Sequence, residues 1–100
     1  MALLPGYTVG DELGRILQLA DKKDSNRSIT YAECGELLEQ KLRELFSNCY
    51  NLEELFAEVK LLASNGQSVD QKNYCYSLAA AGVRLGRAFA PSSGYLPVHL

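Results

Sequence analysis

Carboxylate side chains gather in the polar segment between residues 20 and 33, and carboxylate oxygens are what a hard cation such as calcium binds. Asp21 and Asp24 supply negative charge, and Glu33, at the start of a predicted helix, could offer two oxygens. Three basic residues in the same segment cancel much of that charge. Because calcium affinity follows the number and charge of the ligands, the segment favours no binding over weak binding.

The other residues that could do chemistry form no recognisable catalytic set. His99 is the one histidine, so neither a Ser/His/Asp arrangement nor a zinc site with several histidines can be assembled. The solvated face of a helix explains Glu53, Glu54 and Glu58 more simply than paired-carboxylate catalysis does. We therefore expect that the protein is not an enzyme. We also expect no cofactor, with weakly bound calcium as the one possible exception.

Cys34, Cys49 and Cys75 are an odd number of cysteines without CxxC spacing. This pattern favours free thiols in a reducing compartment, and hence a cytoplasmic location. Cys34 and Cys75 fit small, buried apolar positions, while a redox or metal role stays open as the alternative.

The composition is that of one ordinary globular domain, with 100 residues, 47% of them apolar and 22% charged. The net charge of −2 argues against a nucleic-acid binder. The longest apolar run covers residues 78–83, far too short to span a membrane.

Apolar residues recur at helical spacing in four segments, each preceded by a residue that can cap a helix. The predicted caps are Thr8, Thr30, Asn51 and Ser68, and the last three are followed at the third position by a glutamate or glutamine. No segment alternates with the period of a half-buried strand. We therefore predict an all-α fold, with one helical lobe over residues 1–90 and an extended tail over 91–100.

The predicted fourth helix, residues 68–89, is apolar over most of its circumference and carries a seam of small side chains. Two glycines inside a helix cost about 1 kcal/mol each relative to alanine, so close approach of another helix should offset them. That helix is either the first helix of the same chain or a helix of a second subunit. For a homodimer built on the first and last helices, the expected contact residues are Ile16, Cys75, Ala79, Gly82 and Gly86.

Several stretches resemble the EF-hand superfamily, in particular its small dimeric branch of calgranulins, calcyclin and psoriasin. The 14-residue segment Ala20–Glu33 has the length of that branch's first loop, and GELLEQKLRELF resembles its second helix. SNGQSVDQKNYCYSLAAAGVRLGRAF resembles its second loop and last helix. The resemblance implies two helix–loop–helix units, joined by a short backbone bridge between Ile29 and Val69.

The same resemblance implies degenerate calcium loops. The second loop would run from Leu62 to Asn73, which puts a leucine at the first ligand position and a neutral amide at the last. We expect no calcium there. In the first loop, Glu33 with the backbone of residues Ala20–Ser28 is the one weak candidate.

The expected function is calcium-independent binding of a partner protein's helix or peptide in an apolar groove beside the third and fourth helices. Arg84 and Arg87 are either solvated or anchors for an acidic partner. Two alternatives stay open: a small helical regulatory or inhibitor protein, viral ones included, that acts on a larger host complex, and a calcium sensor or buffer. The residues expected to contact the partner are Phe46, Tyr50, Phe56, Tyr76, Arg84, Arg87 and Phe89.

Overall fold

A computed structural model describes residues 9–22, 28–47 and 51–88 of the chain. It confirms the predicted all-α class, with four helices and a single short hairpin in the part described. The elements are α1 (Val9–Asp21), α2 (Tyr31–Leu45), α3 (Leu52–Leu62), β1 (Ser64–Asn65), β2 (Ser68–Val69) and α4 (Gln71–Ala88). The predicted Thr8 cap and the 91–100 tail lie outside the described residues.

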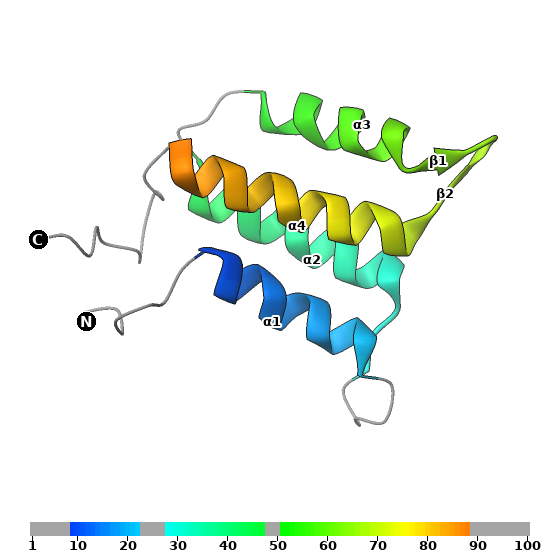
Figure 1. Cartoon of the computed structure of the whole chain (residues 1–100), viewed down its shortest axis with the longest axis horizontal. Coiled ribbons are helices and arrows are strands. Elements are labelled where there is room, and N and C mark those ends of the chain that lie inside the picture. The colour runs from blue at the N-terminus through cyan, green and yellow to red at the C-terminus, as the bar shows by residue number, and fades with distance from the viewer. Residues whose placement is uncertain (1–8, 23–27, 48–50, 89–100) are drawn as a thin grey trace, which may run out of the picture.

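Helix α4 is the centre of the bundle, because it packs against all three other helices. Figure 1 shows α4 lying along α2, with α1 on one side of this pair and α3 on the other. The helix predicted to be apolar on several sides is therefore the one with a neighbour on several sides. The apolar core is made by Val9, Leu13, Ala20, Cys34, Leu38, Leu42, Leu45, Phe46, Leu52, Phe56, Val59, Ala63, Tyr74, Cys75, Leu78 and Ala79.

The start of α2 confirms the predicted capping box. The Thr30 hydroxyl accepts a hydrogen bond from the backbone N–H of Glu33 at 3.0 Å. The Glu33 carboxylate in turn accepts from the backbone N–H of Thr30, also at 3.0 Å. Two N–H groups that the helix leaves without a partner are thus satisfied by side chains only three positions apart.

The start of α3 differs from the prediction. Asn51 has a φ of 72°, in the left-handed region, and its side chain makes no capping hydrogen bond. Asparagine tolerates this conformation better than most residues, so Asn51 serves as the bend that leads into α3. The prediction that Asn51 and Glu54 form a capping box was wrong.

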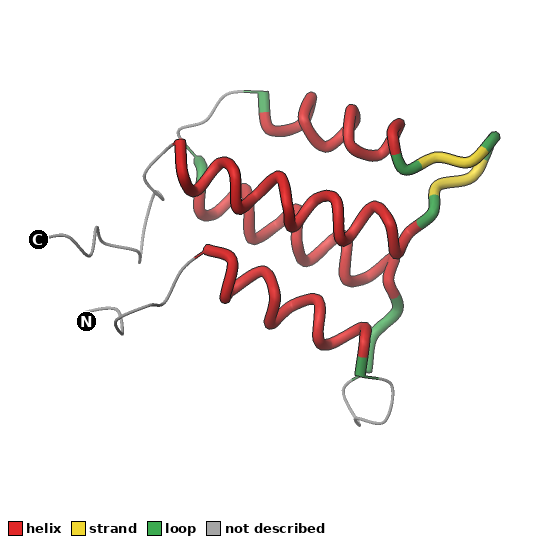
Figure 2. Tube along the Cα trace, in the orientation of Figure 1, coloured by secondary structure: helices red, strands yellow, loops and turns green. Residues whose placement is uncertain are grey.

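The predicted bridge between Ile29 and Val69 was also wrong. Val69 pairs with Ser64, and Ser68 pairs with Asn65, within one antiparallel hairpin (Figure 2). Gly66, with a φ of 73°, supplies the left-handed residue that the tight turn needs. The backbone N–H of Ile29 instead donates to the carbonyl of Leu19, at 3.1 Å. A hairpin of adjacent residues closes a much shorter loop than a bridge across the chain, and it costs less entropy.

The hairpin also moves the start of α4. Ser68 lies in β2, and the carboxylate of Asp70 accepts a hydrogen bond from the backbone N–H of Asn73 at 3.1 Å. Asp70 is therefore the residue that caps α4, and the predicted Ser68 cap was wrong. The backbone N–H of Asp70 donates to the carbonyl of Ala63 at 2.9 Å, which ties the end of α3 to the start of α4.

Candidate protein-interaction surface

The carboxylates that suggested a calcium site are used within the fold. Besides capping α2, the Glu33 carboxylate accepts from the Thr30 hydroxyl at 3.1 Å. Asp21 accepts hydrogen bonds from the hydroxyls of Tyr31 and Tyr76, on α2 and α4. Residues 23–27 of the first loop lie outside the described residues. Among the residues that are described, no three His, Cys, Asp or Glu side chains come together as a metal site.

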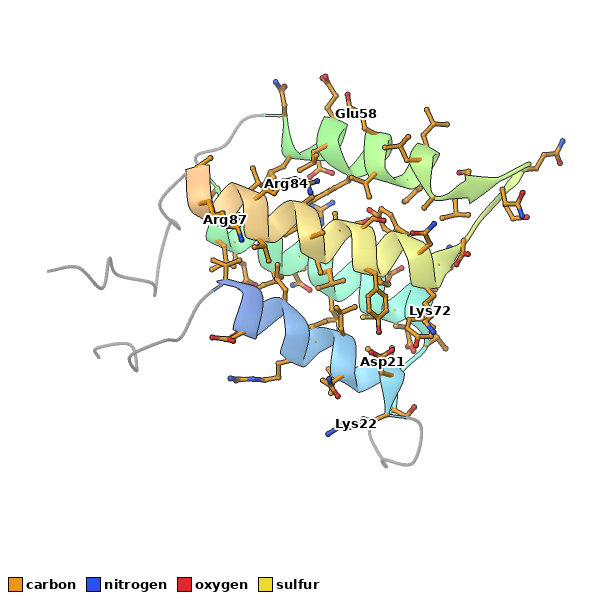
Figure 3. The ribbon with its side chains drawn as sticks, viewed as in Figure 1. Asp21, Lys22, Glu58, Lys72, Arg84 and Arg87 are labelled. Carbon is orange, nitrogen blue, oxygen red and sulfur yellow. The ribbon has the colours of Figure 1, made fainter. Side chains whose placement is uncertain are left out.

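The hydrogen bonds to Asp21 change the acidity of both tyrosines. The bond from Tyr31 to the Asp21 carboxylate, with some burial, raises the pKa of Tyr31 to about 12. The same contact raises the pKa of Tyr76. Both hydroxyls are neutral donors at physiological pH, so Asp21 connects the end of α1 to α2 and α4. Figure 3 shows Asp21 at this end of the bundle, near Lys72. Tyr76 thus has a structural partner within the chain, although the residue is 43% exposed.

Two of the aromatic residues expected to line a groove are part of the core. Phe46 is 1% exposed and Phe56 is 4% exposed, because the helices of this chain cover their rings. In this structure the two residues therefore offer no surface to a partner, and their predicted role in binding stays a prediction. Tyr50 and Phe89 lie outside the described residues.

The predicted dimer seam is filled by the same chain. A Cβ atom at Gly82 would lie 2.5 Å from Leu13 and 2.8 Å from Leu42, and one at Gly86 would lie 3.2 Å from Val9. Helices α1 and α2 therefore occupy the space that the glycines leave. Cys75 and Ala79 are buried, and Ile16 packs against the same core. Of the two alternatives for the seam, contact within the chain is the one observed.

Arg84 and Arg87 are exposed on the C-terminal half of α4 (Figure 3). Arg87 lines an open cavity of about 300 Å³ with Val9, Gly10, Val83 and Gly86, between the ends of α1 and α4. The two arginines are on the surface as expected.

A network of charged and aromatic side chains sets the orientation of α3. The Arg43 guanidinium on α2 donates to both carboxylate oxygens of Glu53 on α3, at 2.6 and 2.9 Å. The same guanidinium lies 5.2 Å from the centre of the Phe56 ring. Hydrogen bonding to Arg43 holds the pKa of Glu53 below its ordinary value. A bidentate arginine–carboxylate pair fixes direction as well as distance, so it constrains rotation of α3.

A second set of contacts holds the other end of α3. The Tyr74 hydroxyl on α4 donates to the Glu39 carboxylate on α2 at 2.6 Å. Lys60 of α3 approaches the same carboxylate at 3.9 Å and lies 5.2 Å from the centre of the Tyr74 ring. Burial and the hydrogen bond to Glu39 together raise the pKa of Tyr74. Leu52, Phe56 and Val59 face the core, Glu53 and Lys60 lie exposed at the edge beside it, and the opposite side of α3 faces solvent.

That opposite side carries two leucines with unusual exposure. Leu61 is 74% exposed and Leu62 is 83% exposed, at the end of α3 where the hairpin begins. The helical spacing of Leu52, Leu55, Phe56 and Val59 continues to Leu62 and predicts that Leu62 is buried with them. The stripe ends one turn earlier, at Val59, and Ala63 takes the next inward position. We call the residues on this side, Glu54, Glu58, Leu61 and Leu62, the α3 outer face.

The α3 outer face is acidic as well as apolar. Glu54 and Glu58 are exposed, and neither makes an ion pair with another residue in the described part of the chain. Figure 3 shows Glu58 projecting from α3 away from α4. The spacing of residues 54, 58, 61 and 62 places all four on one side of a helix. The sequence contained a signal for this surface, because Leu61 does not fit the inward stripe.

Comparison of the chain with protein-family models, with curated proteins and with solved structures finds no match. Within the described residues, none of the helices is long and apolar enough to cross a membrane.

Proposed function

We propose that this protein is an interaction module that binds a basic, amphipathic helix of a partner protein on the α3 outer face. The exposure of Leu61 and Leu62 carries the proposal. Two adjacent leucines, each more than 70% exposed, form an apolar surface whose hydration is unfavourable. Burying each one under a partner would contribute about 1.5–3 kcal/mol.

The charge of the surface supports a basic partner. Glu54 lies two turns before the leucines and Glu58 one turn before them, so a bound helix would meet acidic groups beside an apolar end. Lysine or arginine on the partner could form ion pairs with these two carboxylates, and no existing ion pair would have to break first. Electrostatic complementarity of this kind favours the correct partner and raises the association rate.

The rigid attachment of α3 also supports the proposal. The buried side chains of Leu52, Phe56 and Val59 hold α3 against the bundle, and the exposed Arg43–Glu53 and Lys60–Glu39 pairs add a preferred orientation. A surface held in one orientation loses less entropy on binding than a mobile one. The proposed binding is independent of calcium, because the Glu33 and Asp21 carboxylates already have hydrogen-bond donors within the chain. It does not depend on the EF-hand resemblance.

A second copy of the chain is the other occupant to consider for this surface. Two α3 outer faces brought together would place Glu54 and Glu58 of each copy near those of the other, and like charges oppose such contact. We therefore propose a partner of opposite charge. Sedimentation of the full chain, with and without the Leu61→Ser/Leu62→Ser double substitution, measures any self-association through these leucines.

The test uses a synthetic helical peptide with leucines on one face and lysines on the other. A matched peptide carries glutamate in place of every lysine. We expect the basic peptide to shift the backbone amide resonances of residues 54–62 in the NMR spectrum, and the acidic peptide to leave them unchanged. Shifts centred on another surface, or equal shifts with both peptides, would contradict the proposal.

Variants locate the contact. Leu61→Ser/Leu62→Ser should weaken binding of the basic peptide about tenfold or more, because the apolar area is lost. Glu54→Lys/Glu58→Lys should weaken it by repulsion and reduce its salt dependence. Leu37→Ala and Glu36→Lys on α2 are the matched controls, and both should bind as the unaltered protein does. Equal losses in the controls would show that the peptide binds without a specific site.

A further inference from the structure

Two cysteines distant in the sequence are brought together in the core. Cys34 lies in the first turns of α2 and Cys75 in the first turns of α4, and both are free thiols with 0% exposure. The proposed partner surface does not involve them. Two thiols that share one buried space can be oxidised together to a disulfide when an oxidant supplies the two-electron step.

The position of the Cys75 sulfur is fixed by its neighbours on α2. Its thiol donates to the backbone carbonyl of Tyr31 at 3.0 Å. A Cβ atom at Gly35 would lie 3.7 Å from the same sulfur. Tyr31, Cys34 and Gly35 occupy one side of α2, at positions three and four apart. The Cys75 sulfur therefore lies over the side of α2 that carries Cys34.

Each thiol has a backbone carbonyl as its acceptor. Besides the bond from Cys75 to Tyr31, the Cys34 thiol donates to the Ile16 carbonyl of α1 at 3.6 Å. Burial raises the pKa of both thiols, that of Cys75 to about 12, so both are protonated in the resting protein. Within the described residues, no third metal-ligating side chain joins the pair.

We propose that Cys34 and Cys75 are a redox modification site, at which a peroxide converts the dithiol into a disulfide that joins α2 to α4. In the first step a cysteine thiolate, formed in a transiently opened core, attacks one peroxide oxygen and breaks the O–O bond. This gives a sulfenic acid and hydroxide, which takes up the lost thiol proton as water. In the second step the other cysteine attacks the sulfenic sulfur, forms the S–S bond and releases a second water. The two thiols are oxidised by two electrons, and the peroxide is reduced to two waters.

The consequence of the disulfide follows from the topology. A bond between residues 34 and 75 closes a loop that contains α3 and the hairpin. Constraining that loop in the unfolded chain stabilises the folded state. In the reduced protein α2 and α4 are joined only by noncovalent contacts, and in the oxidised protein they are also linked covalently.

The experiment uses the full chain with Cys49→Ser, so that the third cysteine cannot form mixed disulfides. The protein is exposed to hydrogen peroxide under native conditions, and peptides are mapped by mass spectrometry without reductant. We expect a Cys34–Cys75 disulfide within one chain. We also expect a rise in the unfolding temperature on the order of 10 °C that dithiothreitol reverses.

Two results would overturn the proposal. One is a dithiol that stays reduced in the folded protein while the same peroxide oxidises the urea-unfolded chain. The other is oxidation that yields only sulfinic acids or links between chains. Cys34→Ala and Cys75→Ala, each in the Cys49→Ser background, should show no rise in unfolding temperature. If either variant fails to fold, the peptide map of the Cys49→Ser protein decides the question by itself.

Discussion

Gly82 of α4 lies directly against Leu13 of α1, and a Cβ atom at position 82 would come within 2.5 Å of a Leu13 methyl carbon. Leu13 and Leu42, the second neighbour at this position, are both 0% exposed. Neither methyl group can move aside into solvent. This close approach is why a helix at the centre of the bundle has glycine where alanine would favour helix formation.

Gly82→Ala should therefore destabilise the protein. The overlap with two buried leucines costs up to about 3 kcal/mol, which exceeds the gain of about 1 kcal/mol in helix propensity. Gly14→Ala in α1 is the matched control, because a Cβ atom there meets nothing within 4 Å. It should stabilise the protein by about 0.5–1 kcal/mol. Urea unfolding measures both, and changes of the same sign would show that α1 does not pack on Gly82.

The Thr30 cap should contribute measurably to stability. Thr30→Ala removes the hydroxyl that accepts from the Glu33 N–H, and it should cost about 1 kcal/mol in urea unfolding. Asn51→Gly at the start of α3 should change stability little, because the Asn51 side chain makes no capping bond and glycine adopts its left-handed φ freely. A loss at position 51 equal to that at position 30 would contradict the assignment of the two helix starts.

The Arg43–Glu53 pair should make stability depend on acid pH. Hydrogen bonding to Arg43 lowers the pKa of Glu53 from its ordinary value of 4.5. The carboxylate is thus favoured in the folded state, so its contribution is present above that value and is lost as pH falls through the lower, folded pKa. Glu53→Gln should flatten the fall of unfolding temperature with acidification, and Glu54→Gln should not. Identical profiles for the two variants would show that the Arg43–Glu53 pair does not contribute to the pH dependence of stability.

The Asp21 contact should appear in the alkaline titration of tyrosine. The pKa of Tyr31 is raised from 10.0 to about 12, so the neutral hydroxyl is favoured in the folded state. Its stabilising effect is present below pH 10 and is lost as pH rises toward 12. Asp21→Asn should shift the ionisation of Tyr31 back toward 10, as measured by tyrosinate absorbance against a Tyr31→Phe reference. An unchanged titration would mean that Asp21 does not hold this hydroxyl.

Substitutions along α3 should separate binding from stability. Leu62→Ser should change the free energy of unfolding by no more than about 0.5 kcal/mol, because Leu62 is 83% exposed. Phe56→Ala should cost about 3–5 kcal/mol, because its ring fills the core. Thermal and urea unfolding distinguish these outcomes. A large loss at Leu62 would show that something in the folded chain covers this side of α3.

The sequence by itself determined the four helices and the start of α2. Thr30 and Glu33 are three positions apart, so their capping box needs only local geometry, and the apolar spacing within each helix is equally local. The pairing of Val69 could not be read in this way. Val69 could pair with Ser64, five positions back, or with Ile29, forty positions back. The residue pattern of these short strands favoured neither partner.

Only the tertiary structure decided which apolar residues are available to a partner. Phe56 and Leu62 share the apolar spacing of α3, yet one is 4% and the other 83% exposed. Periodicity gives the side of a helix on which a residue lies, but not where the neighbouring helix ends. The same holds for Gly82, which could have faced a second subunit until α1 was placed against it. Burial depends on residues distant in the sequence, and that is the physical reason the interaction surface required coordinates.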